Sequence, residues 1–90
     1  IYGPSGVRFE NITEDPWLEV LHVNTIAPLM VAQALLTNIV TSQRRTIVNI
    51  SSLMGSIEAN TEGKAYIYRS SKAALNAITK SMAIDLALQQ

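Results

Sequence analysis

The sequence contains no cysteine in its 90 residues. This absence excludes a disulfide framework, a thiol nucleophile and a cysteine-ligated metal site. The only histidine is His22, and a single imidazole cannot supply the several ligands that a protein metal site needs. A chain without cysteine is compatible with the cytosol, where thiols stay reduced. We therefore expect a cytoplasmic protein that binds no metal.

The sequence also lacks an excess of charge of either sign, with seven Lys and Arg against seven Asp and Glu. A neutral chain without a basic cluster gives no electrostatic reason to expect a nucleic-acid partner. Its longest apolar stretch, residues 29–36, contains Gln33 and is far shorter than the roughly 20 residues of a membrane-spanning helix. No basic segment followed by a cleavage site opens the chain. We expect neither nucleic acid nor membrane as a partner, and no signal peptide.

What is present is a globular composition, with 48% hydrophobic and 16% charged residues. Such a balance argues against disorder. The length allows one small domain with a modest core. Residues 1–12 are predicted to form a loop because four turn-forming residues lie close together. These residues are Gly3, Pro4, Ser5 and Gly6.

A long helix is predicted over residues 13–42, because seven residues, most of them apolar, recur at spacings of three or four and would form a stripe along one helix face. Thr13 is a suitable N-cap, and two acidic residues follow it in the first turn. Pro28 falls inside this segment, so we expect a kink there. The stripe consists of Trp17, Leu21, Asn24, Pro28, Val31, Leu35 and Ile39.

One strand and a second helix are predicted downstream. Residues 46–50 are β-branched and mostly apolar, which favours a short interior strand of a parallel sheet. Residues 53–65 include two glycines and are expected to form a loop. Residues 66–88 are rich in Ala, Leu, Lys and Met, which favour helix. The order helix, strand, helix is typical of an α/β protein with a doubly wound parallel sheet. One strand cannot make a sheet, so the chain is expected to be part of a larger domain.

Tyr68 and Lys72 are the first candidates for chemistry. They lie four residues apart on a predicted helix and therefore share a face. An ammonium beside a phenol stabilises the phenolate, so that the tyrosine can exchange a proton during reduction of a carbonyl. Taken alone, the pair also fits an ordinary solvated helix face. Tyr66 is a competing tyrosine, but the residue four positions later is Ser70, which supplies no charge.

Two further features support a site. Ser51 and Ser52 follow the predicted strand, and ligands of open α/β sheets bind beyond the carboxyl ends of strands. The alternative is a pair of turn-forming serines. Pro28 has no N–H, so the carbonyl of Asn24 loses its helical partner and becomes available to water or a side chain. The alternative there is a simple proline kink with a satisfied asparagine.

Together, these segments resemble the short-chain dehydrogenase/reductase family, and the resemblance covers essentially the whole chain. The order and spacing of the Asn, Ser, Tyr and Lys residues are similar to the catalytic tetrad of the family. The sequence around Tyr68 is similar to that of the family branch that contains C-factor and sniffer-type carbonyl reductases. The segments are VNTIAP (23–28), TIVNISSLMG (46–55), YRSSKAALN (68–76) and TKSMAIDL (79–86).

The resemblance implies a Rossmann fold, a bound NAD or NADP, with NADP favoured by the branch, and a small carbonyl or alcohol substrate. It implies that Tyr68 is the general acid/base and that Lys72 assists it and binds the nicotinamide ribose. Ser52 would polarise the substrate carbonyl, with Ser51 as the fallback. Asn24 would hold a water that links Lys72 to solvent. Among the cofactor-binding residues, Ile50 and Ser51 would line the nicotinamide pocket beside Tyr68 and Lys72.

The glycine-rich turn that holds the cofactor pyrophosphate is absent from these 90 residues. The Pro-Gly segment and the substrate lid, which the family places after the next strand, are absent too. We therefore expect a catalytic segment, residues 1–90, of one Rossmann-type domain that lacks its glycine-rich half and its lid. The sequence leaves two arrangements open for the helices over 13–42 and 66–88: pairing with their copies in a homodimer, or packing only within one subunit.

Two other functions were weighed against an oxidoreductase. A truncated, non-catalytic chain that only associates through its two apolar helices has the same sequence, so the sequence does not distinguish it. A serine hydrolase is excluded, because the chain has no G-x-S-x-G nucleophile elbow and Arg69 stands where an S-x-x-K motif would need serine before Lys72.

Overall fold

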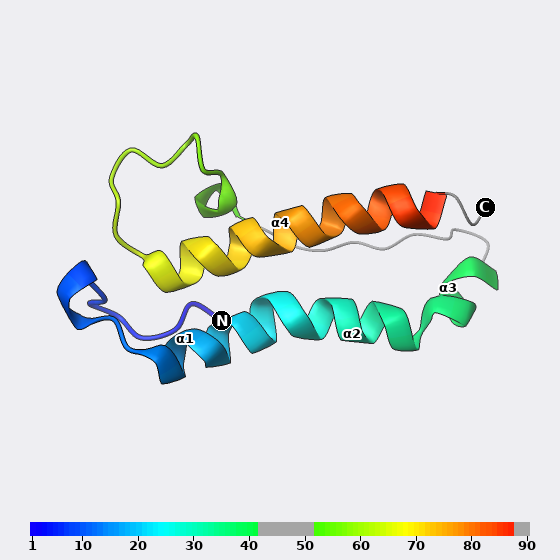
Figure 1. The fold of residues 1–90 in the computed structure, drawn as a ribbon, viewed down its shortest axis with the longest axis horizontal. Coiled ribbons are helices and arrows are strands. Elements are labelled where there is room, and N and C mark those ends of the chain that lie inside the picture. Colours follow the sequence, from blue (N-terminus) through cyan, green and yellow to red (C-terminus); the bar gives the residue numbers. More distant parts are fainter. Residues whose placement is uncertain (42–51, 88–90) are drawn as a thin grey trace.

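The computed structural model describes residues 1–41 and 52–87, and these form two helical rods that lie side by side (Figure 1). The first rod contains α1 (Glu14–Leu21), the π-helical turn η2 (His22–Ile26), α2 (Ala27–Ala34) and α3 (Leu36–Thr41). The second rod is α4 (Tyr66–Ala87). Two short 3₁₀ turns, η1 (Phe9–Asn11) and η3 (Leu53–Gly55), complete the regular structure of the described part.

The two rods run in the same direction (Figure 1). Successive helices that are parallel require a return connection, as in the repeating units of a parallel α/β sheet. Across residues 1–41 and 52–87 all regular structure is helical. The strand predicted at residues 46–50 lies outside the described residues.

The prediction of a second helix over residues 66–88 is confirmed from Tyr66 to Ala87, and Leu88 lies outside the described residues. The chain enters this helix through an unusual turn. Lys64 and Ala65 have backbone φ angles of 60° and 49°, a left-handed conformation that is rare for residues with a side chain. The helix then begins at once, and the Arg69 N–H donates to the Ala65 carbonyl at 2.9 Å.

The prediction of one continuous helix over residues 13–42 is wrong in its interior. The start agrees, since Thr13 has the extended backbone of an N-cap, although its side chain makes no capping hydrogen bond. The helical path ends at Leu35, where φ is −102° and ψ is 11°, and α3 then begins. The backbone there has left the helical region of φ and ψ. No glycine or proline stands at this position, so the local sequence does not indicate the break.

Pro28 lies in the first turn of α2, directly after the π-helical turn. In a π-turn each N–H pairs with a carbonyl five residues back, and the Ala27 N–H donates to the His22 carbonyl in this way. The disturbance predicted at Pro28 is thus present as a π-turn on its N-terminal side. Because α2 continues directly from this turn, the N–H that Pro28 lacks would otherwise pair with a carbonyl of the preceding turn, and its absence leaves that carbonyl without its usual donor.

The core is small and lies where the first rod meets α4. Its buried apolar side chains are Val20, Ala32, Ile67 and Leu75. Trp17 adds a polar link between the rods, because its indole Nε1–H donates to Ser70 Oγ at 3.0 Å. The N-terminal loop packs closely on this core at Gly3, whose φ is +91°. A Cβ at that position would lie 2.8 Å from Val20 Cγ2, so the loop requires glycine there.

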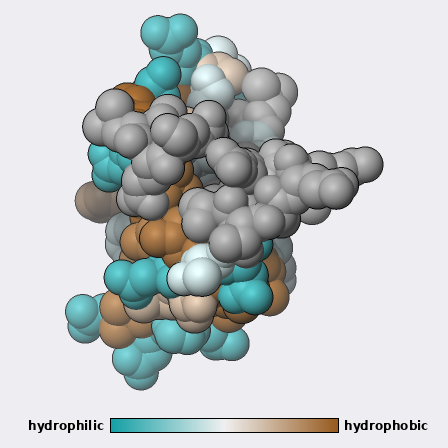
Figure 2. Space-filling model, turned by 90° about the vertical axis from the view of Figure 1, so that its right-hand side faces the viewer, coloured by the Kyte–Doolittle hydropathy of each residue, from teal (hydrophilic) through white to brown (hydrophobic). Residues whose placement is uncertain are grey.

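Apolar side chains also lie on the surface of the rods. Figure 2 shows them among polar ones at the end of the molecule that is on the right in Figure 1. Within the described residues, no helix combines the length and apolar character that crossing a membrane requires. The exposed apolar residues of the first rod are Leu18, Val23, Ile26, Met30, Val31 and Leu35.

Candidate active site

Tyr68 and Lys72 lie one turn apart near the start of α4, as predicted. The Lys72 ammonium nitrogen is 5.8 Å from the centre of the Tyr68 ring. The ring also stacks on Tyr2 of the N-terminal loop, with the ring centres 4.6 Å apart and an interplanar angle of 25°. The Tyr68 ring is therefore held between the N-terminal loop and the helix turn that carries Lys72.

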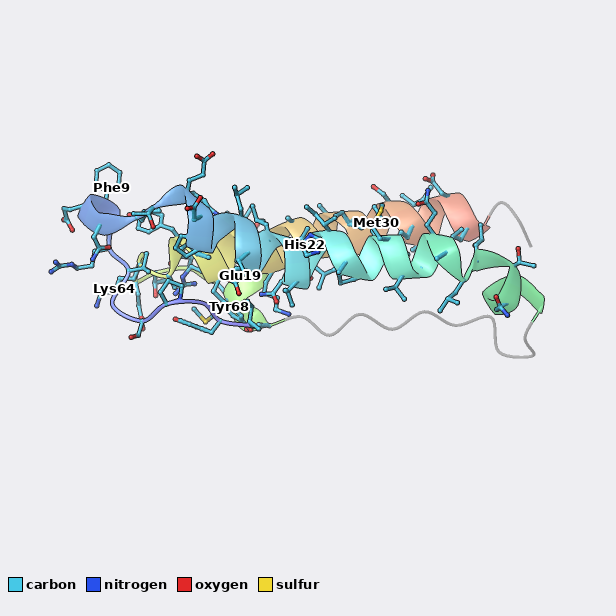
Figure 3. All side chains as sticks on the ribbon, turned by 90° about the horizontal axis from the view of Figure 1, so that it is seen from below. Phe9, Glu19, His22, Met30, Lys64 and Tyr68 are labelled. Carbon is cyan, nitrogen blue, oxygen red and sulfur yellow. The ribbon has the colours of Figure 1, made fainter. Side chains whose placement is uncertain are left out.

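Tyr66, the competing tyrosine, faces a different neighbour. Its ring lies 6.3 Å from that of Phe9, with the rings tilted by 53°. Figure 3 shows Phe9 on the upper side of the molecule, while Tyr68 lies on the lower side. The structure thus brings a cation to Tyr68 and packs Tyr66 on η1.

A cavity of about 460 Å³ opens between the N-terminal loop and the start of α4. Tyr68 forms part of its wall, and the space is large enough for a small molecule. Two of the lining side chains are positively charged and none is negatively charged. The lining includes Tyr2, Pro4, Arg8, Lys64, Ile67 and Tyr68.

Asn24 lies in the π-turn η2 and its side chain is almost fully buried, at 5% exposure. Its amide spans the backbone of Ile1: Oδ1 accepts from the Ile1 nitrogen and Nδ2 donates to the Ile1 carbonyl, both at 2.6 Å. Nδ2 also donates to Ser71 Oγ at 3.1 Å. The side chain of Asn24 therefore fixes the beginning of the N-terminal loop against α4.

Ser71 is completely buried and joins this network to the turn of α4 that carries Tyr68. Its hydroxyl accepts from Asn24 Nδ2 at 3.1 Å and donates to the Tyr68 carbonyl at 2.8 Å. A second residue of the π-turn, Thr25, donates its hydroxyl to the Ser71 carbonyl at 2.8 Å. Buried hydroxyls that are fully satisfied rigidify their surroundings. The π-turn thus holds the helix segment that begins with Tyr68.

Ser52 opens the 3₁₀ turn η3, which packs on α4. Its hydroxyl accepts from the Met54 N–H at 3.2 Å, and its carbonyl accepts from the Gly55 N–H at 2.9 Å. Gly55 is buried against α4, where a Cβ would lie 3.1 Å from the Lys72 carbonyl carbon and 2.8 Å from Asn76 Nδ2. This close approach keeps the serine turn beside the helix turn that carries Lys72. Ile50 and Ser51, which were predicted to line the cofactor pocket, lie outside the described residues.

No cluster of three or more His, Asp or Glu side chains that could hold a metal ion occurs in the described parts of the chain.

Residues 3–90 match the sequence model of the short chain dehydrogenase family. The chain belongs to this family. A solved structure, the carbonyl reductase Sniffer of D. melanogaster, superposes with a TM-score of 0.86 and is 37% identical over 97% of this chain. The C-signal protein of Myxococcus xanthus is 45% identical over 64 residues, and galactitol 2-dehydrogenase of Rhizobium johnstonii is 31% identical over 85 residues.

These relatives support the predicted branch of C-factor and sniffer-type reductases and the oxidoreductase family. They also support a Rossmann-type fold, of which the described residues provide helices. The matched region makes up 71% of this chain and 39% of C-signal, 94% of this chain and 33% of the galactitol enzyme, and 40% of Sniffer. The chain thus spans about two fifths or less of the relatives that it matches.

Sequence reasoning missed the partners that hold the predicted residues. Ser71 and Thr25 gave no signal, because serine or threonine in a helix has no distinctive local pattern. Tyr2 was assigned only to a loop. The single available hint was that Ser71 follows Tyr68 by three residues, a spacing at which a serine hydroxyl can return to a backbone carbonyl.

Proposed function

We propose that these residues form the catalytic segment of an NAD(P)-dependent oxidoreductase that interconverts a carbonyl and an alcohol. The observation that carries the proposal is the Tyr68 phenol in the wall of a cavity, with the Lys72 ammonium 5.8 Å from its ring. We also propose that the segment works within a longer Rossmann-type subunit, because the glycine-rich turn that binds the cofactor pyrophosphate does not occur in these 90 residues.

In this mechanism Tyr68 donates a proton to the alkoxide that develops as the carbonyl is reduced, and accepts it back in the reverse direction. Lys72 stabilises the phenolate that results, because a nearby ammonium favours the charged form of the phenol. The Ser52 hydroxyl orients and polarises the substrate carbonyl. Ser71 acts as a positioning residue, since it holds the Tyr68 carbonyl and not the substrate.

The cofactor is NADP or NAD, and NADP is favoured by the likeness to a carbonyl reductase of the same branch. The residues fit such a group, because an ammonium on the same helix face as the phenol offers three donors to ribose hydroxyls. When bound, the nicotinamide supplies or accepts the hydride. Ile50 and Ser51 remain proposed neighbours of the nicotinamide.

The Asn24 carbonyl is proposed to hold a water that connects Lys72 to solvent. Two observations support this role. Pro28 cannot donate the usual hydrogen bond to that carbonyl, and the adjacent π-turn changes the hydrogen-bond register in the same region. π-Turns of this kind occur frequently at functional sites.

A titration with NADPH and NADH, followed by nicotinamide fluorescence, tests the proposed role of this segment. We expect no binding to the isolated 90 residues at millimolar cofactor, and saturable binding once the glycine-rich half is supplied. Lys72→Ala in the complete subunit should weaken binding, because a ribose contact is lost, whereas the exposed Lys80→Ala should not. Saturable binding to the isolated chain that is lost in Lys72→Ala would show that the glycine-rich half is not required.

We further propose a homodimer through the helices that begin at residues 14 and 66. The support is the row of apolar side chains exposed on the first rod, among them Val31 at 57%. Val31→Glu should shift the complete subunit from dimer to monomer in analytical ultracentrifugation, because it places a charge in an apolar interface. Ile57→Glu is the matched control, since Ile57 is 84% exposed in a loop. A dimer that survives Val31→Glu would contradict this interface.

A further inference from the structure

The cavity beside Tyr68 is lined by positive charge, although the chain as a whole has no net charge. The protein is neutral overall, yet two cationic residues, Arg8 and Lys64, line this cavity and no acidic residue does. One comes from the N-terminal loop and the other from the turn that precedes α4. We propose that the substrate is an anionic carbonyl compound, whose carboxylate or phosphate group binds Arg8 and Lys64 while its carbonyl faces Tyr68. This inference rests on the proposed function.

Arg8 is held in place by its backbone. The Arg8 N–H donates to Asn11 Oδ1 at 2.6 Å, and the Asn11 N–H donates back to the Arg8 carbonyl at 3.0 Å. Asn11 also donates from Nδ2 to the Gly6 carbonyl at 3.0 Å. One asparagine thus fixes both ends of the short segment that carries the arginine, which reduces the ordering that ligand binding would require.

The guanidinium of Arg8 has only a weak internal competitor. Its Nε lies 3.7 Å from Glu10 Oε2, and both side chains are 73% exposed. Exposed pairs of this kind contribute little, since water screens them. A substrate anion that enters the cavity can therefore replace Glu10 as the partner of Arg8.

Lys64 is placed at the cavity by an unfavourable backbone. It is the second of three successive residues with positive φ, at 73° for Gly63, 60° for Lys64 and 49° for Ala65. Glycine adopts this conformation readily, but lysine and alanine do not. Strained positions of this kind gather at ligand-binding sites. Figure 3 shows Lys64 and Tyr68 on the same lower side of the molecule.

The remaining lining suits the body of such a substrate. Tyr2 and Tyr68 present stacked rings, and Pro4 and Ile67 add apolar surface. A volume of about 460 Å³ accommodates a molecule of the size of a substituted aromatic aldehyde. Apolar walls with charged groups at one place orient a ligand, so the cations fix which end of the substrate faces the phenol.

The test compares the complete enzyme on 4-carboxybenzaldehyde, its neutral methyl ester and 4-formylphenyl phosphate. We expect a lower KM for an anionic aldehyde than for the ester, and the better of the two anions identifies the preferred group. Arg8→Gln and Lys64→Gln should each raise the KM for the anionic aldehyde roughly fivefold, and leave that for the ester unchanged. Lys80→Gln is the matched control, because it removes the same charge from an exposed position about 18 Å along α4 from Tyr68.

The outcomes separate this inference from the proposed function. If the KM for the ester equals that for both anions, and neither variant changes any KM, the proposed anion site is wrong. The proposed oxidoreductase function is then unaffected. If no aldehyde is reduced, both proposals fail. If a variant misfolds and loses activity on all substrates equally, the salt dependence of the wild-type enzyme tests the inference instead. Its KM for the anionic aldehyde must rise with ionic strength while that for the ester stays constant, and equal salt dependence would overturn the inference.

Discussion

Tyr68→Phe should lower the turnover of the complete enzyme by roughly 10²–10⁴, because it removes the hydroxyl that we propose as the proton donor to the developing alkoxide. The substitution removes only the hydroxyl. The ring stacking on Tyr2 and the apolar contact with the cavity wall should therefore persist. KM for the carbonyl substrate should change far less than kcat, since an interaction made in the transition state is lost. Steady-state kinetics of carbonyl reduction measure both quantities.

Tyr66→Phe provides the matched control for this substitution. It removes the same hydroxyl two residues earlier in the same helix, from a tyrosine that packs on Phe9 and has Ser70, not lysine, four residues later. We expect near-normal turnover. Comparable losses in both variants would point to a general effect on α4, and full activity in Tyr68→Phe would remove Tyr68 from the mechanism.

The sequence predicted most of what depends on local pattern. The spacing of Tyr68 and Lys72 placed them on one helix face because helical periodicity decides which side chains meet. The content of helix-favouring residues predicted α4 almost residue for residue. Pro28 indicated a disturbance of the first rod, since a missing N–H has to be accommodated somewhere. What the proline could not indicate is the form that the disturbance takes, which is a π-turn on its N-terminal side.

The parts that escaped prediction depend on contacts between distant residues or on strained backbone. Thr25 and Ser71 are 46 residues apart, and only the packing of the two rods brings them together. Gly55 is buried because it meets Lys72, which nothing in its own loop reveals. Lys64 and Ala65 adopt left-handed φ angles that their local preference opposes, so a prediction from propensity excludes the observed turn. The cavity wall is thus less predictable than the helix that carries the tyrosine.

The buried network gives the second large expected effect. Asn24→Ala removes the hydrogen bonds to the Ile1 carbonyl and to Ser71 from a side chain that is 5% exposed. Each such bond contributes about 1 kcal/mol, so the free energy of unfolding of the complete subunit should fall by about 2 kcal/mol. The Asn24 main-chain carbonyl remains, so any loss of turnover reports on the position of Tyr68 and the N-terminal loop. Urea unfolding and kinetics on the same samples separate the two effects.

A double-mutant cycle shows whether Asn24 and Ser71 act as one unit. Ser71→Ala should cost about 1–2 kcal/mol alone, and the double variant should cost less than the sum, because both single changes break the same bond. Gln33→Ala on the exposed side of the same rod is the control and should change the free energy of unfolding by less than about 0.5 kcal/mol. Strict additivity of Asn24→Ala and Ser71→Ala, or an equal loss in Gln33→Ala, would mean that the π-turn does not hold the turn of α4 that carries Tyr68 through this pair.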